Sequence, residues 1–118
     1  MEFVRQLFRR LLPGRKWHVA MQVDAADELP TNIPALSAVM VGTPAAPGWL
    51  AFDCPCNTGH RIMLNLDWRR SPYWRVTNTR RLTIKPSVDS CRPERRCHYF
   101  VREGKVKWVP DSWRNNNG

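Results

Sequence analysis

The chain has 118 residues, of which 42% are hydrophobic, so it fits one folded domain and is not an intrinsically disordered protein. Nineteen Lys and Arg against ten Asp and Glu give a formal net charge of +9, which favours an acidic protein, nucleic acid or an anionic membrane surface as partner. No run of 18 apolar residues predicts a transmembrane segment, and no secretory signal is recognisable, so we expect a cytoplasmic protein.

The first predicted element is an amphipathic α-helix within residues 1–14. Phe3, Leu7 and Leu11 recur at a spacing of four, which places them on one helical face, and arginines occupy other positions of the wheel. A Pro-Gly pair at 13–14 ends the pattern. Such a helix can dock on the domain or a partner, or lie on a membrane surface.

Residues 15–110 predict a single domain of short β-strands. Alternating apolar and polar residues between proline, glycine and asparagine turns mark these strands. They fall at 17–23 and 36–42, in a hairpin over 49–66, at 73–77 with 81–85, and at 99–102 with 105–109. Residues 111–118 predict a flexible tail, because they end in a polar Asn-rich run.

A cysteine pair lies at the tip of the hairpin over 49–66. Cys54 and Cys56 are separated only by Pro55, and residues two apart on a strand face the same side, so both sulfurs can meet one metal ion. Four cysteines in a chain without a secretory signal indicate metal ligands rather than disulfides. Tetrahedral zinc needs two further ligands, and the candidates are His60, Cys91, Cys97 and His98.

The choice among these candidates depends on strand geometry. Cys97 and His98 are adjacent, so they point to opposite faces if both lie in a strand, and only one of them can be a ligand. We predict that Zn²⁺ is bound by Cys54, Cys56, Cys91 and His98, a mixed sulfur and nitrogen set that favours zinc over iron. The fold class that follows is mainly β, with antiparallel hairpins in a small zinc-stapled sheet or barrel, plus the N-terminal α-helix.

Four ordered blocks of the sequence resemble a small bacterial family of unknown function. Residues 52–66 (FDCPC, then GHRIMLNL) resemble its CPCGCG-H…LNL signature, and the segments 72–76, 82–88 and 91–108 resemble three later motifs in the same order. The chain departs from the family at Thr58, where the family has a third cysteine. The family is encoded beside ubiquitin-like proteins, E1-like and E2-like enzymes and JAB-type peptidases.

The resemblance implies a role in bacterial ubiquitin-like conjugation, as a peptidase that trims the C-terminus of the ubiquitin-like protein. Its partners would be that protein and the E1-like or E2-like enzymes. If the zinc is structural, a separate nucleophile is needed, and Ser87 in the Lys-Pro-Ser-Val block is the candidate. His60 or His98 can serve as its base, and with His98 on the metal the predicted catalytic pair is Ser87 and His60. Zinc with three protein ligands and an activated water is the other route, but no HExxH helix accompanies it.

A second hypothesis needs no catalysis. A zinc-stabilised module could bind an acidic protein or nucleic acid through its arginine-rich stretches at 69–81 and 92–96, with some of its six tryptophans as stacking or anchoring side chains. Binding to nucleic acid would weaken steeply as salt concentration rises, which distinguishes it from a peptidase.

Overall fold

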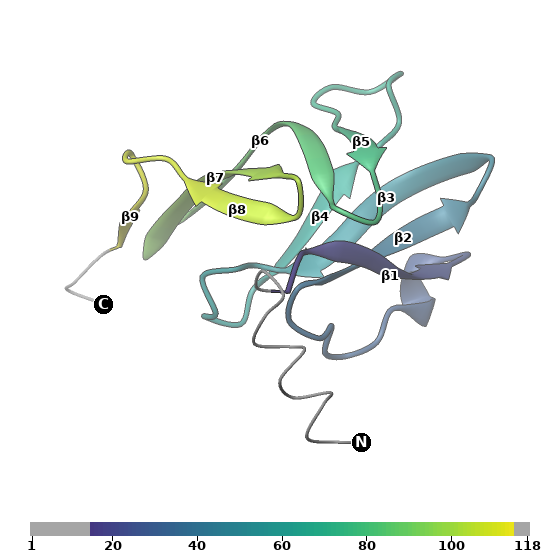
Figure 1. Cartoon of the computed structure of the whole chain (residues 1–118), viewed down its shortest axis with the longest axis horizontal. Coiled ribbons are helices and arrows are strands. Elements are labelled where there is room, and N and C mark those ends of the chain that lie inside the picture. The colour runs from purple at the N-terminus through teal and green to yellow at the C-terminus, as the bar shows by residue number, and fades with distance from the viewer. Residues whose placement is uncertain (1–14, 115–118) are drawn as a thin grey trace, which may run out of the picture.

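The computed structural model describes residues 15–114, which form two β-sheets (Figure 1). The first sheet has the strand order β1-β2-β3-β4, with β1 His18–Val23, β2 Ser37–Thr43, β3 Ala46–Asp53 and β4 Arg61–Asn65. The second has the order β5-β6-β7-β8, with β5 Arg75–Asn78, β6 Thr83–Arg92, β7 Arg95–Arg102 and β8 Lys105–Trp108. The short strand β9, Trp113–Arg114, pairs with β7.

The predicted fold class needs a correction. Within residues 15–114 the structure has no α-helix, and its one helical turn is the 3-10 helix η1, Ala26–Glu28, between β1 and β2. The expected β domain plus α-helix is therefore wrong for the described part of the chain, and the expected single sheet or barrel is two separate sheets. The segment on which the helix was predicted lies outside the described residues.

The predicted hairpins are present. Strands β3 and β4 pair antiparallel around the cysteine tip, β5 pairs with β6, and β7 pairs with β8 around Glu103-Gly104. Both turn residues, Glu103 and Gly104, have positive φ, as a two-residue hairpin turn of this hand requires. A Cβ on Gly104 would lie 2.6 Å from the Cβ of Lys16, so only glycine fits this close approach.

The long hairpin of β6 and β7 was not predicted as such. Two prolines lie in this region: Pro86 falls where the β6 and β7 registers shift, and Pro93 falls in the connecting turn. Neither position needs a backbone N–H in the sheet ladder. The two strands run from residue 83 to residue 102 and carry Ser87, Cys97 and His98, which belong to the sites described below.

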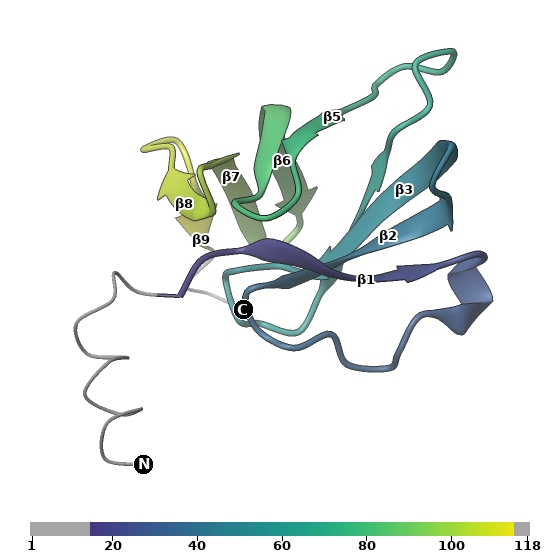
Figure 2. The ribbon, with the colours of Figure 1, turned by 45° about the vertical axis from the view of Figure 1, so that its right-hand side comes forward.

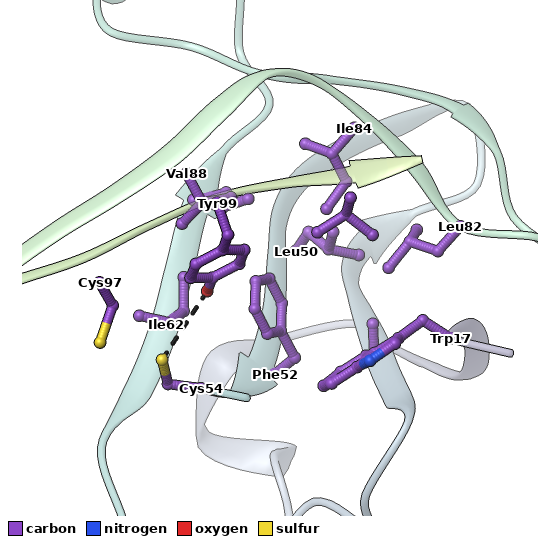
Figure 3. Packing of buried hydrophobic residues seen from close by; sticks show 13 residues of the cluster. Trp17, Leu50, Phe52, Cys54, Ile62, Leu82, Ile84, Val88, Cys97 and Tyr99 are labelled. Carbon is purple, nitrogen blue, oxygen red and sulfur yellow. Dashed lines mark hydrogen bonds between the residues drawn. The ribbon is translucent and has the colours of Figure 1, made fainter. Parts of the chain in front are cut away.

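Figure 2 shows the strands of the two sheets, and apolar side chains from both sheets meet in a shared core cluster (Figure 3). Phe52 of β3 packs edge-on against Trp17 at 5.6 Å between ring centroids, and Tyr99 of β7 is fully buried. Strand β7 alternates: Cys97, Tyr99 and Val101 are buried, and the residues between them face away from the core. This alternation assigns Cys97 and His98 to opposite faces of the same strand.

Candidate functional site

Four side chains that can bind a metal ion converge where the β3–β4 tip meets β7. Cys54, Cys56, His60 and Cys97 each offer one ligand atom, and these atoms all lie within 4.8 Å of one another. Figure 3 shows Cys54 and Cys97 beside the core residues, with the Cys54 sulfur 3.9 Å from the Tyr99 hydroxyl. The cluster joins the two sheets, because three residues come from the first sheet's hairpin tip and one from the second sheet.

The tip is a tight loop that aims its side chains inward. The backbone N–H of Cys54 donates to the carbonyl of His60 at 2.9 Å, and that of Asn57 donates to the carbonyl of Cys54 at 3.1 Å. Asn57 and Gly59 have positive φ values of 61° and 89°, a conformation that asparagine and glycine adopt most readily. Folding the loop back in this way brings residues 54, 56 and 60 to one side of the hairpin.

The donor set fits a metal ion. The Nε2 atom of His60 is buried and has no hydrogen-bond partner in the described part of the chain, although a buried imidazole nitrogen without a partner is costly. Its other nitrogen, Nδ1, lies 3.3 Å from the Thr58 hydroxyl and 3.5 Å from the Cys56 sulfur. Three thiols and one imidazole within reach of each other can complete the coordination of a tetrahedral ion.

The thiols differ in their tendency to ionise. Burial raises the pKa of Cys54 to about 12, so this thiol stays protonated unless a cation stabilises its thiolate. Burial opposes ionisation of Cys56 as well, but hydrogen bonds from Thr58 hold the pKa of Cys56 below its ordinary value. Arg95 donates from Nε to the sulfur of Cys97 at 3.2 Å. A bound cation would deprotonate the whole set, since thiolates are the ligands.

The structure groups the predicted metal ligands differently from the sequence analysis. Cys54 and Cys56 are in the cluster, together with His60 and Cys97. Cys91 is exposed near the end of β6, opposite Arg96, and is not part of this group. The reason is the length of the β6–β7 hairpin: Cys91 lies in a strand instead of a loop, and the strand phase turns Cys97, not His98, toward the core.

A second constellation lies on the other face of β7. The Oγ of Ser87 lies 2.9 Å from Nε2 of His98, and Nδ1 of His98 lies 2.9 Å and 3.1 Å from the two carboxylate oxygens of Asp111. With Nδ1–H donating to Asp111, Nε2 is free to accept the Ser87 hydroxyl proton. The structure thus brings Ser87 to His98, and it holds His60, the other candidate base, in the metal-ligand cluster.

Arg96 forms ion pairs with Asp111 and with a second carboxylate nearby, Asp89. Its guanidinium lies 3.2 Å from Asp111 and 2.8 Å from Asp89, so it bridges the two carboxylates. The Arg96 hydrogen bonds hold the pKa of Asp89 below its usual range. Because 43% of the Asp111 side chain is exposed, the ion pair with Arg96, and not burial, orients its carboxylate.

Backbone contacts hold the serine and the histidine in place. The indole Nε1 of Trp74 donates to the carbonyl of Ser87 at 3.0 Å. The Ser112 hydroxyl accepts from the backbone N–H of His98 at 3.0 Å and donates to its carbonyl at 2.9 Å. Asp111 and Ser112 belong to the stretch predicted as a flexible tail. The only sequence signal that could have pointed to them is an acidic residue soon after the last predicted strand.

A serine, a histidine and an aspartate connected in this order define the arrangement used by serine hydrolases, here on a small two-sheet β domain. A family model described as bacterial ubiquitination-like system serine protease (BubE) matches residues 25–109, and the chain belongs to this family. Ser87 and His98 lie inside the matched residues, and Asp111 lies just beyond them. Searches of curated proteins and of solved structures each found no match.

Family membership confirms the resemblance to proteins of bacterial ubiquitin-like operons and makes the chain a component of a bacterial ubiquitination-like system. In the described part of the chain, no helix has the length and apolar character that crossing a membrane requires.

Proposed function

We propose that the chain is a serine peptidase that cleaves the polypeptide at the C-terminus of a ubiquitin-like protein, with Ser87 as nucleophile, His98 as general base and Asp111 as the group that orients His98. The observation that carries the proposal is the chain of contacts from the Ser87 hydroxyl through both nitrogens of His98 to Asp111, each 2.9 Å long. The family description, a serine protease, supports the same reaction class.

The reaction follows from these positions. Oγ of Ser87 attacks the carbonyl carbon of the scissile bond as its proton moves to Nε2 of His98, and Asp111 stabilises the imidazolium that forms. His98 then protonates the departing amine, the C–N bond breaks, and an acyl ester remains on Ser87. Water attacks this ester with His98 again as base, which releases the carboxylate product and restores the Ser87 hydroxyl.

We further infer that the cluster of Cys54, Cys56, His60 and Cys97 holds a structural Zn²⁺. Thiolate and imidazole ligands suit zinc, and four protein ligands leave no position for a reactive water. When bound, the ion would fasten the β3–β4 tip to Cys97 of β7. The residue after Cys97 on this strand is His98. A cytoplasmic location is consistent with this role, because reduced thiols are maintained there.

The substrate assignment rests on the family. A peptidase of a ubiquitination-like system has two natural bonds to cut. One is the peptide bond between the terminal glycine and an extension that follows it, and the other is the bond to a conjugated partner. Both present an extended C-terminal tail followed by an amide. The ubiquitin-like protein is therefore the proposed partner, and its E1-like and E2-like enzymes act on the product of the first cleavage.

Two measurements on the full chain test this function. A fluorophosphonate probe reacts with an activated serine hydroxyl, so it should label the wild type at Ser87 and leave Ser87→Ala unlabelled. The ubiquitin-like protein of the same bacterial system, extended at its C-terminus, should be shortened by the wild type and stay intact with Ser87→Ala. Ser90→Ala is the matched control, on the same strand but outside the triad. Equal cleavage by wild type and Ser87→Ala would refute the proposal.

A further inference from the structure

A groove lined in part by two basic residues begins one residue from the proposed nucleophile. It encloses about 490 Å³ between the loop before β5 and the first half of β6, and Pro86, which directly precedes Ser87, is part of its wall. The other lining residues are Ser71, Pro72, Tyr73, Arg75 and Lys85. A polypeptide lying across Ser87 can therefore continue into this groove.

Two cations face the groove from opposite strands. Arg75 of β5 and Lys85 of β6 are direct partners in the antiparallel register, and both are exposed. Like charges opposite each other on two strands are destabilising, so this pair is unfavourable for the sheet itself. Neither cation forms a salt bridge to an acidic side chain in residues 15–114, whereas Arg96, on the acidic side of the triad, lies between two carboxylates.

The wall of the groove is held rigidly. The buried side chain of Asn65 donates through Nδ2 toward the carbonyls of Asp67, Arg70 and Pro72 at 3.0–3.1 Å, and its Oδ1 accepts from the N–H of Asp67. The backbone of Trp74 is bound to the carbonyl of Asn65 at 2.8 Å, while its indole holds the carbonyl of Ser87. The loop before β5 is thus fixed both to the first sheet and to the nucleophile, which preorganises the groove for a ligand.

We propose that this groove is a specificity subsite that takes an acidic side chain of the substrate, bound between Arg75 and Lys85, a few residues from the scissile bond. The proposal rests on the function proposed above and names what the same site selects. An acidic side chain would relieve the repulsion between the two cations, and Arg75 can bind a carboxylate with two parallel hydrogen bonds. Tyr73, 39% exposed at the same wall, offers an apolar surface to the neighbouring part of the substrate.

The first test uses internally quenched peptides that copy the C-terminal tail of the ubiquitin-like protein. Each peptide carries Glu or Gln in turn at one position on either side of the cleavable bond. With the wild-type chain, we expect at least one position where Glu lowers KM about tenfold relative to Gln, because one well-formed ionic contact of ~1.4 kcal/mol changes affinity tenfold. Equal KM values for Glu and Gln at every position would overturn the proposal.

Charge reversal at Lys85 distinguishes an effect on substrate recognition from an effect on the stability of the sheet. Lys85→Glu places an acid opposite Arg75, so the sheet should be as stable as in the wild type or more so. The KM for the preferred Glu peptide should nevertheless rise about tenfold, and a Lys peptide should recover part of the loss. Arg80→Glu, the same charge change in the β5–β6 turn, is the matched control and should leave KM unchanged. A loss with Arg80→Glu as large as with Lys85→Glu would reduce the effect to overall charge and overturn the subsite.

Two further readouts distinguish failure of the subsite from failure of the proposed function. Fluorophosphonate labelling of Ser87 does not need the groove, so the wild-type chain should label at Ser87 whether or not the peptides show a preference for Glu. Binding of the Glu and Gln peptides to Ser87→Ala does not need catalysis, so it should retain the preference for Glu. Normal labelling without a Glu preference overturns the subsite alone. If Ser87 does not label, the function fails, and the binding measurement by itself then supports or overturns the acidic subsite.

Discussion

Apolar packing holds the side chains on one face of strand β7, and polar contacts hold those on the other face. On the inner face, Cys97, Tyr99 and Val101 are at most 2% exposed and pack against the first sheet. On the outer face, His98 is placed by polar contacts to Ser87, Asp111 and the Ser112 hydroxyl. The inner face is therefore part of the folding core, and the outer face carries the proposed catalytic residues. Substitutions on the two faces should therefore separate stability from activity.

The largest effect is expected on the inner face, at Cys97→Ser. Removing one thiolate from a closed metal site should cost on the order of 3 kcal/mol or more, because such sites contribute roughly 10 kcal/mol to folding. Thermal unfolding and zinc content per chain measure the effect, and chelation of the wild type should reproduce it. Cys91→Ser is the matched control, since Cys91 is exposed and outside the cluster. Equal losses of bound zinc in both variants would assign the metal to a different set of ligands.

On the outer face, His98→Asn should abolish activity without unfolding the domain. The base is lost, so peptide cleavage should fall by about 10³-fold or more, as in other triads. The melting temperature should change by only a few degrees, because His98 lies outside the apolar core. His18→Asn, at an exposed position of β1, should retain full activity. A His98→Asn chain that unfolds like Cys97→Ser would remove the distinction between the two faces.

Asp111→Asn should have a smaller effect on the same reaction. An amide cannot stabilise the imidazolium and can favour the wrong tautomer, so cleavage should fall by about 10²-fold. We expect less than the loss at His98 because Asp111 is partly exposed, and water can replace some of its interaction with the ring. Steady-state rates measure this change. The double variant Asp111→Asn/Ser112→Ala should be impaired more than Asp111→Asn alone, because Ser112 also holds the backbone of His98. Equal rates for the two would leave Ser112 without a role.

The smallest effect concerns Asp89, whose pKa the Arg96 hydrogen bonds lower. A lowered folded-state pKa contributes stability above the unfolded value of about 3.9, and this contribution is lost as pH falls through the folded-state pKa. Because the pair is partly exposed, the contribution should stay below about 1 kcal/mol. Urea unfolding of wild type and Asp89→Asn should therefore differ at pH 7 and converge below about pH 4. A difference that grows on acidification would contradict the sign.

Local patterns in the sequence predicted the β3–β4, β5–β6 and β7–β8 hairpins and the cysteine pair at the tip of the first. Alternation and turn chemistry determine these features within a few residues, so tertiary context is not needed. Ser87 was singled out through the resemblance to the family and not by such a pattern. The choice between Cys97 and His98 was different, because it depends on where β7 begins and hence on strand phase. The spacing of Cys97, Tyr99 and Val101 is compatible with an inner face, but His98 and Phe100 form an equally plausible one. Only the packing of Tyr99 into the core decides between them.

Asp111 could not be predicted for another reason. It follows the last predicted strand, in a polar segment with no periodicity, and its role arises from contacts with β7 residues far from it in the chain. The basic pair Arg75 and Lys85 was visible only as part of a general positive charge. Its position beside Ser87 follows from the register of β5 and β6, which is a property of the folded sheet.

The placement of Cys97 directly before His98 has a consequence for the order in which the protein matures. Residues 54, 56 and 60 leave the ribosome well before β7 does, so a nascent chain carries three of the four proposed metal ligands without the fourth. Cys97, the fourth proposed ligand, and His98, the proposed base, then emerge together as neighbours on one strand. If both proposals hold, the metal site and the Ser87–His98 contact depend on the same late segment, and neither is complete before that segment is synthesised.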